Sequence, residues 1–105
     1  MGAKNVLLLG LTGVVIDEAQ QQLDMPHLRL FGGTGVDDVR SAFTQTGIDH
    51  VIMGAGIDLE TRLEIVREVF RSSDTTVHMK DRVSGKRTFL PFARSVLRGL
   101  DDYQI

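Results

Sequence analysis

The residues of this chain that could do chemistry include glycines that directly follow apolar segments. Residues 6–9 are all apolar and run into a glycine-containing turn, and residues 51–53 do the same. Glycine lets the backbone turn sharply and lets a ligand approach the start of the next helix. We therefore expect backbone N–H groups at these turns to hold a phosphate or carboxylate. The alternative is that the glycines only supply the tight turns of a parallel α/β fold and bind no ligand. The residues expected there are Gly10, Thr12, Gly13, Gly54 and Gly56.

A second group with chemical potential is a cluster of cationic side chains in one predicted loop. Arg82, Lys86 and Arg87 follow Lys80, at the end of the fourth predicted strand. Arginine and lysine bind phosphate well, so these side chains could clamp an anion held at the glycine turns. The alternative is a solvated loop whose charge is partly balanced by Asp81.

These groups must be positioned by strands and helices that alternate along the chain. Apolar runs and alternating patterns predict strands, and apolar residues three and four positions apart predict helices. The predicted strands are residues 5–9, 27–31, 51–53 and 75–80. The predicted helices are residues 14–24, 37–45, 59–71 and 88–100. The chain, residues 1–105, is therefore expected to be a single α/β domain with parallel strands.

The patterns also predict the order of the strands. The first and third strands are apolar throughout their centres, which is typical of strands covered on both faces. The second and fourth alternate, which suits the edges of the sheet. We therefore expect a three-layer α/β/α sandwich with a four-stranded parallel sheet of order 2-1-3-4, as in flavodoxin-like and Rossmann-like folds. The switch point between the first and third strands is where a ligand crevice is expected.

The third helix has the most regular pattern. Asp58 is the expected N-cap. An apolar row at helical spacing is formed by Leu59, Leu63, Val66 and Phe70. The side expected to face water carries Glu60, Glu64, Arg67, Glu68 and Arg71.

The first strand and turn resemble the opening of NAD(P)-binding Rossmann proteins, especially the short-chain dehydrogenases. Residues 51–56 are similar to a later strand and Asn-Ala-Gly turn of that family. The resemblance implies that Gly10, Thr12 and Gly13 lie at the pyrophosphate of NAD(P). The chain departs from the family where the third fingerprint glycine is missing, where Phe31 and Gly32 replace an acidic residue, and where no Tyr-x-x-x-Lys pair occurs.

A second resemblance is to response-regulator receiver domains, which share the 2-1-3-4 order. Residues 49–53 resemble the third receiver strand and residues 75–79 the fourth. The phospho-acceptor position falls on Gly54, and no acidic pair follows the first strand. The resemblance therefore implies a pseudo-receiver that is not phosphorylated in the usual way.

The composition excludes some classes of function. A net charge of -2 gives no electrostatic reason to expect nucleic acid or an anionic membrane as partner. With no cysteine, the chain has neither disulfides nor thiolate chemistry. No apolar run approaches the ~18 residues of a membrane span. The three histidines are scattered without ligand spacing, so no metal site is expected. We expect a cytoplasmic protein.

An uncovered edge strand invites pairing with another chain. We therefore expect a homodimer through the strand at 75–80 or the helix at 88–100.

The sequence as a whole is compatible with two functions. The first is a non-catalytic or regulatory module that binds a nucleotide or other phosphate-bearing ligand at its glycine turns. The alternative is a homodimeric protein-interaction module of pseudo-receiver type without a small-molecule ligand.

Overall fold

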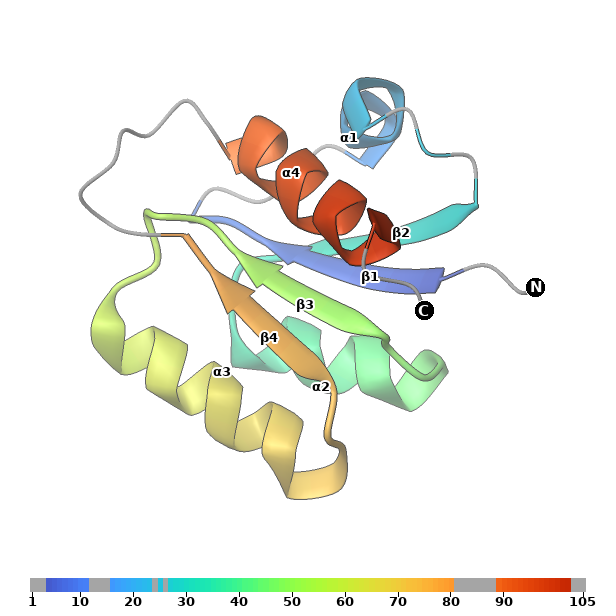
Figure 1. The fold of residues 1–105 in the computed structure, drawn as a ribbon. Helices are drawn as coiled ribbons and strands as arrows, with labels where there is room; N and C mark the ends of the chain where they lie inside the picture. Colours follow the sequence, from blue (N-terminus) through green and yellow to red (C-terminus); the bar gives the residue numbers. More distant parts are fainter. Residues whose placement is uncertain (1–3, 12–15, 24, 26, 81–88, 103–105) are drawn as a thin grey trace.

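The core of the structure is a parallel sheet with the expected strand order. The computed structural model describes residues 4–11, 16–23, 25, 27–80 and 89–102. Its strands are β1 (Lys4–Leu9), β2 (Leu28–Gly33), β3 (His50–Met53) and β4 (Thr76–Met79). They pair in parallel in the order β2-β1-β3-β4, which confirms the predicted topology. β1 and β3 form the middle of the sheet, and β2 and β4 are its edges (Figure 1).

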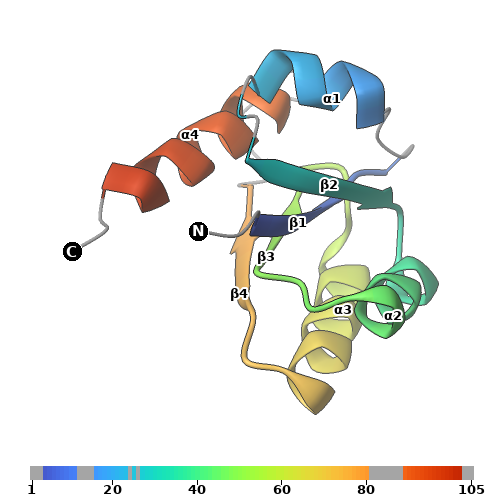
Figure 2. The same ribbon diagram turned by 90° about the vertical axis from the view of Figure 1, so that its right-hand side faces the viewer.

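Four helices cover the two faces of the sheet. They are α1 (Ile16–Leu23), α2 (Val36–Gln45), α3 (Leu59–Ser72) and α4 (Phe89–Asp102). α1 and α4 lie together on one face, whereas α2 and α3 lie together on the other (Figures 1 and 2). The result is the three-layer α/β/α sandwich expected from the sequence.

The apolar runs of β1 and β3 serve both faces because side chains alternate along a strand. Leu7 and Leu9 pack with Val51 and Met53 toward α2 and α3. On the opposite face, the alternate residues of the same strands pack toward α1 and α4. That second cluster contains Val6, Leu8, Ile52, Ala19, Leu23, Ala93 and Leu97. Four consecutive β1 residues, 6–9, are fully buried, which is why this strand reads as unbroken apolar sequence.

β2 extends further than the sequence pattern predicts. The predicted strand ends at residue 31, but Gly32 and Gly33 also belong to the strand and pair with Leu8 and Leu9 of β1. Gly33 is required by packing, since a Cβ atom there would overlap the Cβ of Asp38 in α2. The Asp38 carboxylate accepts a hydrogen bond from the Thr34 N–H at 2.7 Å.

The helix α3 begins as predicted, but it is rotated relative to the expectation. Asp58 accepts a hydrogen bond from the Thr61 N–H at 3.0 Å and so caps the helix. Its inward face consists of Arg62, Ile65 and Val69, all buried. The expected inward row is largely exposed: Leu59 is 63%, Leu63 56% and Phe70 53% accessible. Two apolar rows compete on this helix, and the row that includes Ile65 and Val69 is the one that meets the sheet.

Candidate functional site

The turns that follow β1 and β3 lie against each other at the switch point of the sheet. A Cβ atom on Gly56 would approach the Cβ of Leu11 to 3.0 Å. A side chain at residue 56 would therefore be in tight contact with Leu11, which shows how near the two turns lie. This is the place where a doubly wound sheet offers a ligand crevice.

The structure describes three of the residues predicted to bind a ligand, namely Gly10, Gly54 and Gly56. The Gly10 N–H donates to the Gly33 carbonyl at 3.1 Å, and the Gly54 N–H donates to the Leu9 carbonyl at 2.9 Å. These two amides therefore continue the hydrogen bonding of the sheet. Gly54 is also buried under a ring, because a Cβ atom there would lie 3.3 Å from Cδ1 of Phe89. The other predicted site residues, Thr12, Gly13, Arg82, Lys86 and Arg87, lie outside the described residues.

A buried arginine, which sequence reasoning missed, organises this end of the sheet. Arg62 is only 7% exposed. Its Nε donates to the Ile57 carbonyl at 2.9 Å, and its Nη2 donates to the carbonyls of Gly54 and Lys80 at 3.1 and 2.7 Å. The side chain thereby links α3 to the residues that follow β3 and β4. Its burial could have been inferred from helical spacing, because Arg62 lies three residues before Ile65 and seven before Val69, which are buried on the same side of α3.

Lys80, the first cation of the predicted cluster, does not lie on the rim. It is 5% exposed, and its backbone N–H donates to the Met53 carbonyl at 2.9 Å. Its Nζ lies 5.9 Å from the centre of the Phe92 ring of α4, a cation–π geometry. Lys80 therefore joins β4 to α4 within the fold.

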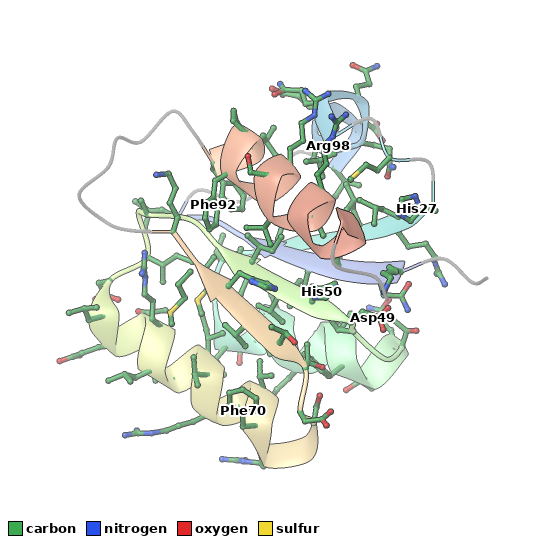
Figure 3. All side chains as sticks on the ribbon, viewed as in Figure 1. His27, Asp49, His50, Phe70, Phe92 and Arg98 are labelled. Carbon is green, nitrogen blue, oxygen red and sulfur yellow. The ribbon has the colours of Figure 1, made fainter. Side chains whose placement is uncertain are left out.

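Two histidines that are far apart in sequence come together on the sheet. The rings of His50 in β3 and His78 in β4 have centroids 5.6 Å apart and planes tilted by 47° (Figure 3 labels His50). Burial lowers the pKa of His78 below 6.5, because removal from water disfavours the charged ring. Within the described ranges, no group of three or more His, Asp or Glu side chains is placed to hold a metal ion.

Among the described residues, most of the exposed large apolar side chains belong to α3 and the edge strand β4. Leu59, Leu63 and Phe70 are more than half exposed, and Met79 of β4 is 47% exposed. Phe70 lies on the outside of α3 (Figure 3). Val66 and Val77 are partly buried against the core beneath. We call this set, Leu59, Leu63, Val66, Phe70, Val77 and Met79, the β4–α3 surface.

The helix α4, the other predicted contact, uses its apolar residues differently. Ala93 and Leu97 belong to the core, and four further apolar residues of α4 are partly buried against it, namely Phe89, Leu90, Phe92 and Val96. Of the two predicted dimer contacts, β4 is the one whose described residues include an exposed large apolar side chain, Met79. The exposed residues of α3 were not predicted as a contact.

Charged side chains border the β4–α3 surface in an ordered way. Glu60 and Glu64 are exposed in the first half of α3, whereas Arg67 and Arg71 are exposed in the second half. Glu68, expected to face water, has a side chain only 15% exposed and lies 3.3 Å from Arg40 Nε of α2. The exposed charges of α3 therefore change sign along the helix.

No family model matches this chain, and no curated protein or solved structure matches it. None of the described helices is both long and apolar enough to cross a membrane.

Proposed function

We propose that this chain is a non-catalytic protein-interaction module that works as a homodimer through the β4–α3 surface. The observation that carries the proposal is the exposure of Leu59, Leu63 and Phe70, which recur at helical spacing on α3, together with that of Met79 on the edge strand. Exposed apolar side chains that gather in this way are typical of protein contacts. An edge strand adds backbone groups that can pair with another strand.

The mass of the protein in solution tests this proposal. We expect sedimentation or light scattering to give a dimer, and the double variant Leu63→Glu, Phe70→Glu to give a monomer, because buried carboxylates would oppose the contact. Both side chains are more than half exposed, so the variant should keep the melting temperature of the monomeric fold. Leu11→Glu is the matched control, since Leu11 is 68% exposed but lies outside the surface.

The wild-type chain remaining monomeric up to about 1 mM would overturn the proposal, since that limit corresponds to roughly 4 kcal/mol of binding free energy. A dimer that survives the double variant but is lost in Leu11→Glu would also overturn it, and would place the contact at the switch point.

The second candidate is binding of a nucleotide or other phosphate-bearing ligand, with NAD(P) among the compounds to test. It is favoured by the contact between the turn at Leu11 and the turn at Gly56 at the switch point. The test is the melting temperature with NAD, NADP, ATP, flavins and inorganic phosphate. A ligand that binds only the folded state raises the midpoint, and a variant Gly56→Val should remove that rise. No shift with any of these compounds would contradict this candidate.

A further inference from the structure

The geometry points to one arrangement of the homodimer. We infer that two copies place their α3 helices antiparallel about a two-fold axis perpendicular to the sheet, with the two β4 strands adjacent. The inference rests on the proposed function and specifies its interface. It follows from the spacing of the apolar row, the charge order along α3 and the geometry of a sheet edge.

The apolar row on α3, in which Leu59, Leu63 and Phe70 are exposed and Val66 is partly buried, has the spacing of a helix–helix seam. Leu59, Leu63, Val66 and Phe70 are separated by four, three and four residues, which is the alternation found where two helices pack along their length. In an antiparallel pair, Leu63 lies opposite Val66 of the second copy and Leu59 lies opposite Phe70 of the second copy. The small Val66 and the large Phe70 are thus both matched by a leucine.

The charges beside this row favour the antiparallel direction. Glu60 and Arg67 lie seven residues apart, so they flank the seam on the same side of the helix. Running the two helices in opposite directions brings Glu60 of one copy beside Arg67 of the other, and the two-fold axis repeats the pair. Glu64 and Arg71 lie further from the seam and add the same polarity. Complementary charge of this kind selects a register and an orientation.

The sheet edge leads to the same arrangement. A two-fold axis perpendicular to the sheet makes the two β4 strands antiparallel and keeps both α3 helices on one face of the joined sheet. An axis running along the strands would put the two helices on opposite faces, where their apolar rows could not meet. Val77 and Met79 of β4 face the α3 side, since their partners Val51 and Met53 belong to that core cluster.

The distances required are those of ordinary packing. Neighbouring strands lie about 4.8 Å apart. A crossover helix that joins two adjacent strands packs over the space between them, so each α3 lies about half a strand spacing inside its β4. The two helix axes are then separated by about 10 Å, close to the usual 8–10 Å of packed helices. Strand pairing and helix packing can therefore form together.

The first experiment uses single cysteines, which give a clear result because the chain has none of its own. Glu60→Cys and Arg67→Cys are made separately, one of them with a mass tag, and treated with a short bismaleimide. When the two variants are mixed, we expect a cross-linked product that contains one copy of each. Either variant alone should give little cross-linked product. A dimer in which Glu60→Cys alone cross-links as well as the mixture would overturn the antiparallel arrangement.

The second experiment reverses the charges and measures the dissociation constant. Glu60→Lys and Arg67→Glu should each weaken the dimer by about tenfold. Each substitution puts like charges at residues 60 and 67 of opposite copies, and the two-fold axis repeats this contact. The double variant Glu60→Lys, Arg67→Glu restores opposite charges and should recover most of the affinity. Thermal melts of the three variants at equal concentration show that the fold is kept.

The results separate the inference from the function on which it rests. A monomeric wild-type chain would overturn both. The antiparallel arrangement alone would be overturned by a different set of results. In that case the double variant Leu63→Glu, Phe70→Glu dissociates the dimer, but the charge reversals leave its affinity unchanged and no cross-link joins residues 60 and 67.

Discussion

The Nη2 atom of Arg62 donates a hydrogen bond to the carbonyl of Lys80 at 2.7 Å, so a helix arginine holds the end of the edge strand β4. The same guanidinium reaches the carbonyls of Ile57 and Gly54. One side chain therefore connects α3 to the turn that follows β3 and to the end of β4.

Replacing Arg62 should destabilise the fold strongly. Arg62→Ala leaves buried carbonyls without these donors, and we expect a loss of about 2–4 kcal/mol in the free energy of unfolding. Arg62→Lys should recover only part of it, because an ammonium group cannot present the planar set of donors. Urea unfolding measures both, and Arg94→Ala, an exposed arginine of α4, is the control. Equal stability of Arg62→Ala and Arg94→Ala would show that these bonds do not matter.

The close approach of β2 and α2 predicts a cost for a single methyl group. Gly33→Ala would force the new Cβ against that of Asp38, and we expect a loss of about 1–3 kcal/mol from overpacking. Gly47→Ala is the matched control, because a Cβ atom at residue 47 has no neighbour within 4 Å. Denaturation of the two variants under the same conditions should separate them clearly; similar midpoints would contradict the packing argument.

Loss of the buried hydrogen bond of Thr75 should lower the stability of the fold more than loss of an exposed hydrogen bond. Thr75 is 9% exposed and its Oγ1 donates to the Ile48 carbonyl at 2.7 Å. Thr75→Val removes this donor from a buried carbonyl, so we expect a loss of about 1–3 kcal/mol. Thr44 makes a similar bond to the Arg40 carbonyl at 2.8 Å on the exposed side of α2. Water can replace that bond, so Thr44→Val should change stability much less.

Burial of His78 predicts a dependence of stability on pH. Because its pKa is lowered in the folded chain, the unfolded chain binds the proton more readily. The free energy of unfolding should therefore be highest above pH 6.5, fall as the pH drops through that value, and level off below the folded pKa. His78→Gln should flatten this part of the profile. Urea unfolding at a series of pH values measures the profile, and an unchanged profile in His78→Gln would contradict the role of His78.

The strand order could be predicted because a strand that is buried on both faces has apolar residues at consecutive positions. β1 and β3 are apolar at consecutive positions, whereas exposed Arg29 in β2 and Thr76 in β4 mark the edges. The position of the switch point between β1 and β3, where the turns at Leu11 and Gly56 meet, followed from this order alone. The extension of β2 through Gly32 and Gly33 was missed, because glycines are read as turns unless the neighbour that needs the space is known.

The rotation of α3 could not be predicted from its own pattern. Its longer apolar row, with Leu63 and Phe70, resembles a core face, while the row that is buried contains Arg62. The guanidinium of Arg62 is satisfied there by carbonyls of the turn after β3 and of Lys80 at the end of β4. Such partners are a property of the assembled sheet. For the same reason, the meeting of His50 and His78 became visible only once β3 and β4 were in register.

The two edges of the sheet are formed by different strands, β2 and β4, and the choice of edge determines how many chains the proposed contact can join. A contact in which β4 meets β4 uses the same strand from each copy, so it is complete at two chains and leaves only β2 at the outer ends. On β2, the exposed Arg29 lies with its guanidinium 5.8 Å from the ring of Phe31, and a charge on an edge strand discourages further pairing. A contact of β4 with β2 would instead add chains without limit. The proposed assembly is a closed particle of fixed size, not the beginning of a fibre.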